Sequence, residues 1–185
     1  MKDQKSNDRI LAVYLMSKGF AYSIFEGPMS AVDWGVKEQR SREKNARCLD
    51  AVAKLIEQYQ PDVLIVEDCG EKGSRRSGRI RRLYRSLATF AGHQSLDVYR
   101  YSRTQIRQCF ANLGAITKYE IAQTLSKLIP SFAHRLPPAR KVWMSEDTRM
   151  GIFDAASLAW TYFCRDCASP SSEADSQKNG TLFPT

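Results

Sequence analysis

Residues 9–26 read RILAVYLMSKGFAYSIFE and give the clearest indication of the fold. It consists of two apolar runs of strand length, the second rich in aromatic and β-branched residues. Only Ser17 and Lys18 separate the two runs, which predicts a tight β-hairpin. A third run follows a Gly-Pro break, so the chain is expected to open with three antiparallel strands, at Arg9–Met16, Gly19–Glu26 and Ala31–Lys37.

The segments that follow change their period and predict a mixed sheet. Apolar residues share one face at helical spacing over Glu43–Tyr59, which predicts a helix. Val63–Val66 is a short, wholly apolar run, typical of a strand covered on both faces. Further patterns predict a fifth strand at Leu96–Tyr101 and helices at Ile80–Phe90, Ser102–Phe110, Thr117–Ile129 and Thr148–Phe163.

Together these elements predict one α/β domain. Its sheet has five strands, three antiparallel and then parallel ones, and helices flank it. With 185 residues, the chain is expected to hold this domain at residues 9–165, between a flexible N-terminus (1–8) and a disordered C-terminal tail (166–185) that is polar and without period. No apolar stretch reaches the length of a membrane helix or resembles a signal peptide, so we expect a cytoplasmic protein.

The charge of the chain favours a polyanionic partner. Lys and Arg number 28 against 20 Asp and Glu, a formal net charge of +8. Residues 72–85, KGSRRSGRIRRLYR, contain many cations and no acid. A solvated charged face is the alternative, but such faces usually mix both signs, whereas guanidinium groups bind phosphates in bidentate geometry. The predicted nucleic-acid-binding residues are Arg75, Arg76, Arg79, Arg82, Lys118, Arg140 and Lys141. Composition does not separate DNA from RNA.

Three carboxylates lie where a metal ion could bind. Glu67 follows the buried strand at its carboxyl end, the edge at which α/β sheets usually bind ligands. Asp154 lies in an otherwise apolar helix, where an unpaired charge is costly. Asp147 is expected two turns earlier on the same helix face. Oxygen ligands of this kind suit Mg²⁺ or Mn²⁺. The alternatives are that Glu67 is solvated and that Asp147 caps the helix.

The order of the elements resembles the ribonuclease H-like fold, and within it the RuvC-like Holliday-junction resolvases. The resemblance covers about Arg9 to Cys164. The segments DWGVK, PPARKVW and EDTRMGIFDA are similar to those of an uncharacterised bacterial subgroup, and the matching stretches are Arg9–Val13, Ile65–Glu67 and Asp154–Ala159. The resemblance implies a Mg²⁺- or Mn²⁺-dependent endonuclease in DNA recombination, acting as a homodimer on four-way junctions. It implies that Glu67 and Asp154 are catalytic metal ligands.

The chain departs from this family at two positions. The family has an Asp at the end of the first strand, where this chain has Tyr14, and an acid or His one turn before the last Asp, where it has Gly151. A phenol is a poor Mg²⁺ ligand because its pKa of about 10 leaves it neutral. Asp147 is the expected substitute as a third catalytic metal ligand. The alternatives are a catalytically inactive nucleic-acid-binding module on the same fold, and a nuclease acting on structured RNA.

Overall fold

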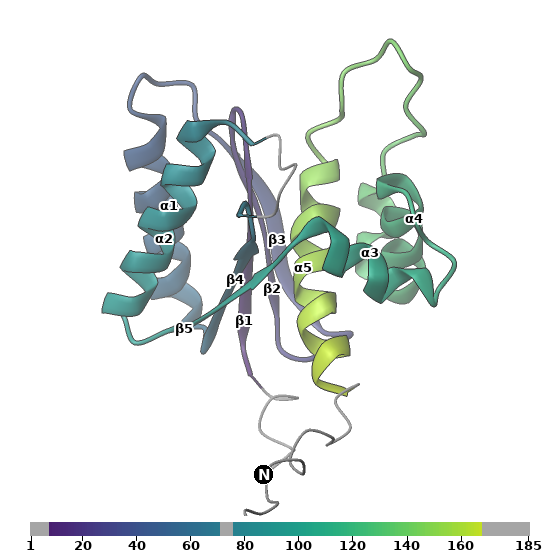
Figure 1. Ribbon diagram of the computed structural model, residues 1–185, viewed down its shortest axis with the longest axis horizontal. Coiled ribbons are helices and arrows are strands. Elements are labelled where there is room, and N and C mark those ends of the chain that lie inside the picture. Colours follow the sequence, from purple (N-terminus) through teal and green to yellow (C-terminus); the bar gives the residue numbers. More distant parts are fainter. Residues whose placement is uncertain (1–7, 71–75, 168–185) are drawn as a thin grey trace, which may run out of the picture.

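The computed structural model describes residues 8–70 and 76–167 of the chain (Figure 1). The predicted flexible N-terminus and disordered tail lie almost wholly outside these residues, as does Arg75 of the basic stretch. Within the described part, no helix has both the length and the apolar character needed to cross a membrane.

A five-stranded sheet forms the centre of the molecule, in the order β3-β2-β1-β4-β5. Neighbours in the β3-β2-β1 half pair antiparallel, whereas β4 is parallel to β1 and β5 is parallel to β4. This is the predicted mixed sheet, and the predicted hairpin places Met16 opposite Gly19. The strands are β1 (Ile10–Met16), β2 (Gly19–Phe25), β3 (Ala31–Glu38), β4 (Val63–Glu67) and β5 (Asp97–Tyr101).

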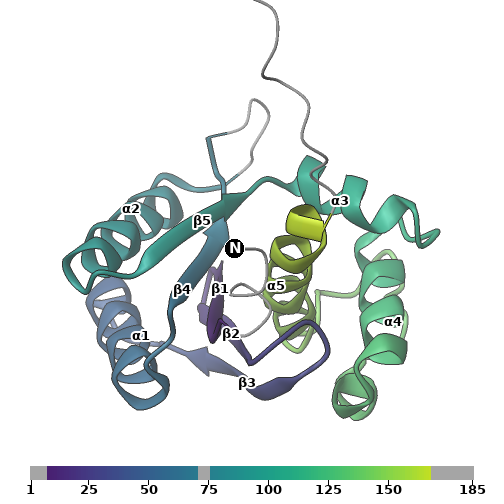
Figure 2. The ribbon, with the colours of Figure 1, turned by 90° about the horizontal axis from the view of Figure 1, so that it is seen from below.

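Helices cover both faces of the sheet (Figure 2). On one face lie α1 (Lys44–Tyr59) and α2 (Gly78–His93), and on the other lies α5 (Met150–Cys167). Behind α5 pack α3 (Arg103–Ala111) and α4 (Lys118–Leu128), followed by the short 3₁₀ helix η1 (Pro130–Arg135). The sequence pattern did not predict η1.

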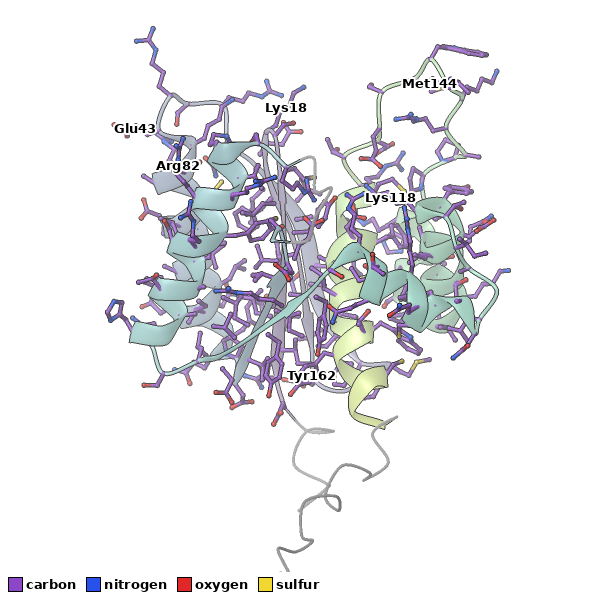
Figure 3. All side chains as sticks on the ribbon, in the orientation of Figure 1. Lys18, Glu43, Arg82, Lys118, Met144 and Tyr162 are labelled. Atoms are coloured by element: carbon purple, nitrogen blue, oxygen red, sulfur yellow. The ribbon has the colours of Figure 1, made fainter. Side chains whose placement is uncertain are left out.

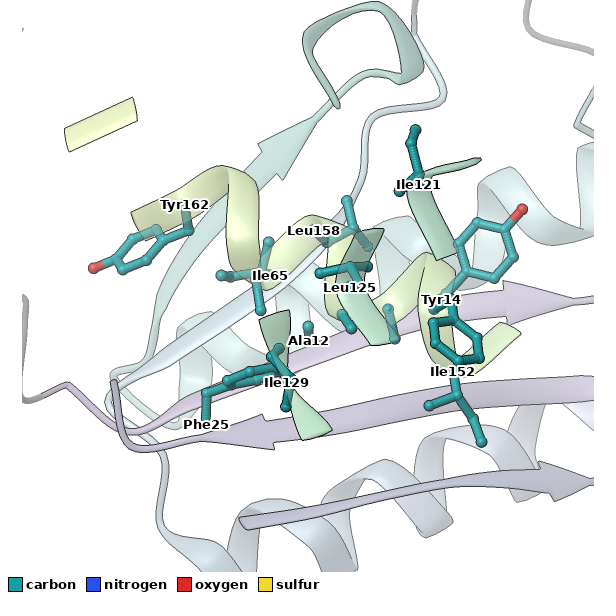
Figure 4. Packing of buried hydrophobic residues seen from close by; sticks show 14 of the residues in the cluster. Ala12, Tyr14, Phe25, Ile65, Ile121, Leu125, Ile129, Ile152, Leu158 and Tyr162 are labelled. Atoms are coloured by element: carbon teal, nitrogen blue, oxygen red, sulfur yellow. The ribbon is translucent and has the colours of Figure 1, made fainter. Parts of the chain in front are cut away.

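The alternation of side chains along β1 divides the interior into two cores. Odd and even residues of a strand point to opposite faces. Leu11, Val13 and Leu15 pack against α1 and α2, whereas Ile10, Ala12 and Tyr14 belong to the core beneath α5. Figure 4 shows this second core, with Ala12 and Ile65 of the sheet beside Leu158 of α5. The period of β1 therefore directs Tyr14 toward α5.

Parallel pairing brings several element ends to one edge of the sheet. Val13 lies opposite Val66, so Tyr14 and Glu67 follow side by side at the carboxyl ends of β1 and β4. Both α3 and α4 begin with complete capping boxes, the second being the one predicted at Thr117. Their first residues are Arg103 and Lys118. Cationic side chains from two helix starts are thus added to this edge.

Helix α5 begins later than predicted and approaches the sheet closely at Gly151. It starts at Met150 rather than at Thr148 because the preceding residues form a turn, in which the Met150 N–H donates to the Asp147 carbonyl. A Cβ atom on Gly151 would lie 2.7 Å from the Met16 Sδ atom and 2.9 Å from the Ala21 Cβ atom. A metal-binding acid or His at this position is therefore incompatible with the packing.

We expect Gly151→Ala to lower the free energy of unfolding by about 1–3 kcal/mol, because overpacking forces the sheet or the helix to move. Urea unfolding followed by circular dichroism measures the change. The matched control is Gly92→Ala in α2, where an added Cβ meets nothing within 4 Å. The better helix propensity of Ala should leave that variant unchanged or more stable by up to about 1 kcal/mol. Equal stabilities of Gly151→Ala and the unaltered chain would contradict the close approach.

Candidate functional site

A pocket opens at the carboxyl ends of β1 and β4, between β1, β4, α3, α4 and α5. Part of its lining is apolar, formed by Ile106, Ile121, Phe153 and Leu158. The polar part is formed by Tyr14, Glu67, Arg103, Arg107, Lys118, Asp154 and Ser157. Three of the residues singled out from the sequence, Glu67, Asp154 and Lys118, are thus brought together around Tyr14.

Glu67 is a buried carboxylate held by two arginines. Its side chain is 4% exposed. The Arg76 Nε and Nη2 atoms lie 2.8 and 2.5 Å from its Oε2 atom, and the Arg103 Nε atom lies 3.1 Å from its Oε1 atom. The Tyr84 hydroxyl lies 3.5 Å from Oε2. A buried charge is tolerated only with such partners, and here each carboxylate oxygen already accepts from a guanidinium group.

Tyr14 is packed among cations. Its hydroxyl accepts a hydrogen bond of 2.7 Å from the Arg103 Nη2 atom. The Arg76 guanidinium lies over its ring, 4.6 Å from the centroid, and the Lys118 Nζ atom lies 5.6 Å from it, so both are cation–π contacts. Burial, and next the charge of Asp154, raise the pKa of the Tyr14 phenol. Tyr14 therefore stays neutral and serves as an aromatic support for these cations.

Asp154 and Lys118 form the other half of the pocket. The Lys118 Nζ atom lies 2.8 Å from the Asp154 Oδ2 atom and 2.6 Å from the Glu146 Oε1 atom. The Asp154 side chain is 13% exposed, and burial raises its pKa to about 6 although Lys118 acts in the opposite direction. Lys118 thus connects the pocket to the segment that precedes α5.

The donor set does not fit the two-metal centre that the resemblance implies. Arg76, Arg103 and Lys118 lie against the carboxylates of Glu67 and Asp154, so these oxygens already face cations. A hard divalent ion needs several oxygen ligands of its own. Across residues 8–70 and 76–167, no three acidic, His or Cys side chains are grouped closely enough to hold a metal ion.

Asp147 does not line the pocket. Its Oδ1 atom accepts from the Arg149 N–H at 2.9 Å, and the Arg149 Nη2 atom lies 2.6 Å from its Oδ2 atom. The hydrogen bonds from Arg149 lower the pKa of Asp147. Because α5 starts at Met150, the expectation that Asp147 shares a helix face with Asp154 is wrong.

The six residues predicted to bind nucleic acid that lie within the described part of the chain fall into three groups. Arg76 and Arg79 make internal contacts, the latter to the Asn45 side chain and to two carbonyls of the β1–β2 turn, Met16 and Ser17. Lys118 lies in the pocket. Arg82, Arg140 and Lys141 are exposed. Figure 3 shows Arg82, Lys18 and Lys118 toward the same end of the molecule, with Tyr162 at the opposite end.

Arg103 and Arg107 are pocket residues that the sequence pattern did not single out. A signal for Arg103 exists, because it directly follows the fifth strand and its Ser102 cap. A strand parallel to β4 must end at the same edge as Glu67, so a cation immediately after it is well placed to reach the acid.

We expect Asp154→Asn to raise the stability at pH 7 by up to about 3 kcal/mol, since a neutral amide avoids the cost of burying a charge. From pH about 4 to about 6 the folded chain keeps a proton on Asp154 that the unfolded chain has lost, so the stability of the unaltered protein falls as pH rises. Urea unfolding between pH 4 and 7 should show the advantage of Asp154→Asn growing across this range.

Asp147→Asn is the control, because the pKa of Asp147 is shifted the opposite way, so its ionised form is the favoured one and the substitution should bring no gain. A loss of stability in Asp154→Asn at pH 7 would show that the ionised carboxylate is needed as a structural partner of Lys118.

Comparisons with known proteins identify the fold. No protein-family model matches the sequence, and no curated protein matches it. Solved structures do resemble it. The Thermus thermophilus RuvC structure superposes with a TM-score of 0.61 at 16% identity, covering 83% of this chain and 92% of that chain.

Two further structures agree. T. thermophilus RuvC in complex with a Holliday junction substrate has a TM-score of 0.63 at 14% identity, covering 85% of this chain and 94% of that one. The yeast mitochondrial Holliday junction resolvase Ydc2 has a TM-score of 0.63 at 14% identity, and the match covers 86% of this chain and 80% of Ydc2. The predicted fold is confirmed: the chain has the RuvC-like form of the ribonuclease H-like fold.

Proposed function

We propose that this chain binds branched DNA through the strand-end edge of its sheet and does not cleave it by two-metal chemistry. The observation that carries the proposal is the set of ion pairs around the pocket carboxylates, in which Arg76, Arg103 and Lys118 compensate Glu67 and Asp154. DNA as the partner is supported by the similar structures, one of which is a RuvC protein in complex with a Holliday junction.

A divalent ion could bind in the pocket only by displacing the cations that already pair with its carboxylates. It would have to separate Glu67 from two guanidinium groups and Asp154 from the Lys118 ammonium. Separating Glu67 from Arg76 would leave a largely buried guanidinium group without a compensating charge, which is strongly unfavourable. The neutral Tyr14 and the tightly packed Gly151 supply no further charged ligand. Two-metal catalysis would therefore require a rebuilt pocket.

The accessible charged side chains at the pocket are positive, which favours binding of an anion. Arg76, Arg103 and Lys118 are balanced by Glu67, Asp154 and Glu146, but the Arg103 side chain is 52% exposed and so remains accessible to a ligand. Arg107 lines the same pocket and is exposed. Guanidinium and ammonium groups bind backbone phosphates independently of sequence. A phosphate at this edge would thus meet fixed cations of the protein itself.

A nuclease on the same fold is the second candidate, favoured by the resolvase identity of the similar structures. Its substrate would be branched DNA or structured RNA, with Mg²⁺ or Mn²⁺ as the cofactor implied by the resemblance. A junction-cleavage assay separates this candidate from the binding protein.

We expect the unaltered chain to bind a labelled four-way DNA junction equally well in Mg²⁺ and in EDTA at matched ionic strength, because its phosphate partners are side chains. Gel shift measures the affinity. Denaturing gels of the same reactions in Mg²⁺ or Mn²⁺ should show no nicked product. Nicking by the unaltered chain that is lost in Glu67→Gln would establish the nuclease instead. The same pair of assays on a four-way RNA junction tests the RNA alternative.

The exposed arginines should contribute to binding through phosphates alone. For duplex DNA, Arg82→Ala and Arg140→Ala should each flatten the slope of log K against log salt by about 0.9. Fluorescence anisotropy at several salt concentrations measures it. Lys54→Ala is the control and should leave the slope unchanged. Lys54 is an exposed cation that lies about 15 Å along α1 from Lys44, the first residue of that helix. An unchanged slope in both arginine variants would remove these residues from the interface.

A further inference from the structure

Residues 136–149 form a projecting loop between η1 and α5. It extends from the end of the molecule at which β1 and β4 finish (Figure 1). Its tip exposes three large apolar side chains, with Val142 92%, Trp143 79% and Met144 48% exposed. Exposed Trp is costly to keep in water and is enriched where proteins bind partners. The tip is therefore a candidate contact surface.

The tip has a defined conformation. The Met144 N–H donates to the Lys141 carbonyl at 3.0 Å, which closes a turn with Val142 and Trp143 at its centre. The Lys141 Nζ atom lies 5.4 Å from the centroid of the Trp143 ring. An open aromatic face beside a cation is the combination with which proteins hold single-stranded nucleic acid, the ring stacking on a base and the cation binding its phosphate.

Both ends of the projecting loop are tied to the first turn of α4. The Tyr119 hydroxyl donates to the Pro137 carbonyl at 3.2 Å, and Lys118 pairs with Glu146 at 2.6 Å. The same Lys118 pairs with Asp154 in the pocket. The loop is thus anchored at the pocket, and its tip is free of these anchors.

The charge at the tip favours a nucleic acid over a protein as the partner. Arg140 and Lys141 precede the Trp by three and two residues and are exposed. Two acids close to the loop's C-terminal end are ion-paired within the protein, Glu146 with Lys118 and Asp147 with Arg149. The tip is therefore apolar and positive.

The number of residues between Trp143 and Glu146 limits how far the tip lies from the loop's contact with Lys118. Trp143 precedes Glu146 by three residues, so their Cα atoms are at most about 11 Å apart. Along one strand of a duplex, successive phosphates advance by about 3.4 Å. Trp143 therefore lies within about three nucleotide spacings of Glu146, the loop residue that pairs with Lys118.

We propose that Trp143 stacks on an unpaired base of the bound nucleic acid while Arg140 and Lys141 bind the neighbouring phosphates. The proposal rests on the proposed function, because it takes the strand-end edge as the binding surface. The binding surface would thus select a base that is freed from its neighbours rather than a continuous duplex.

The test compares two fluorescein-labelled DNAs, a four-way junction with unpaired thymines at its centre and a fully paired duplex of equal length. Trp143→Ala should weaken binding of the first by about 5- to 140-fold, the equivalent of 1–3 kcal/mol at 1.4 kcal/mol per tenfold. Its affinity for the duplex should be unchanged. Trp143→Phe should keep most of the affinity, and Val142→Ala, which alters the neighbouring exposed residue of the turn, should keep all of it.

The outcomes separate the two proposals. If the unaltered chain binds both DNAs and Trp143→Ala binds each DNA as tightly as the unaltered chain does, the stacking role is overturned and the proposed function stands. The exposed Trp is then left as a contact for a protein. Equal losses on junction and duplex would also overturn base stacking. If the unaltered chain binds neither DNA, the proposed function fails and the stacking role fails with it. Circular dichroism of Trp143→Ala checks that the exposed substitution leaves the fold intact.

Discussion

The buried carboxylate of Glu67 is the interaction on which the strand-end edge depends. A carboxylate that is 4% exposed costs several kcal/mol unless it is paired. Arg76, which precedes α2, and Arg103, which opens α3, supply the pairing, and both also contact Tyr14 of β1. One charge thereby fixes three segments that are far apart in the sequence, and removing it would leave two partly buried guanidinium groups without their partner.

The second ion pair extends this arrangement to the surface. Lys118 joins Asp154 of α5 to Glu146 of the projecting loop, and the adjacent Tyr119 holds the other end of that loop. The orientation of the tip is therefore coupled to the pocket through two consecutive residues of α4. We expect a substitution of Asp154 to alter the contact of Lys118 with Glu146 of the loop, because Asp154 and Glu146 share the same ammonium group.

The elements of this fold follow from local patterns. Alternation along β1, the apolar run of β4 and the capping box at Thr117 each need only neighbouring residues, which is why they were predicted. Glu67 and Asp154 also follow from local signals, a strand end and a charge in an apolar helix. Helix α5 begins two residues after the predicted Thr148 because a turn held by Asp147 and Arg149 competes with the helix there.

Local sequence patterns are sufficient to predict the mixed sheet, the five α-helices apart from the exact start of α5, and the two carboxylates beside Tyr14. The surroundings of those carboxylates, in contrast, depend on how the folded chain packs. Arg76 and Arg103 lie 9 and 36 residues from Glu67, and Lys118 lies 36 residues before Asp154, so no sequence period relates them. Whether a buried acid binds a metal ion or an internal cation depends on which side chains reach it when the chain is compact, and that is a property of packing rather than of local pattern.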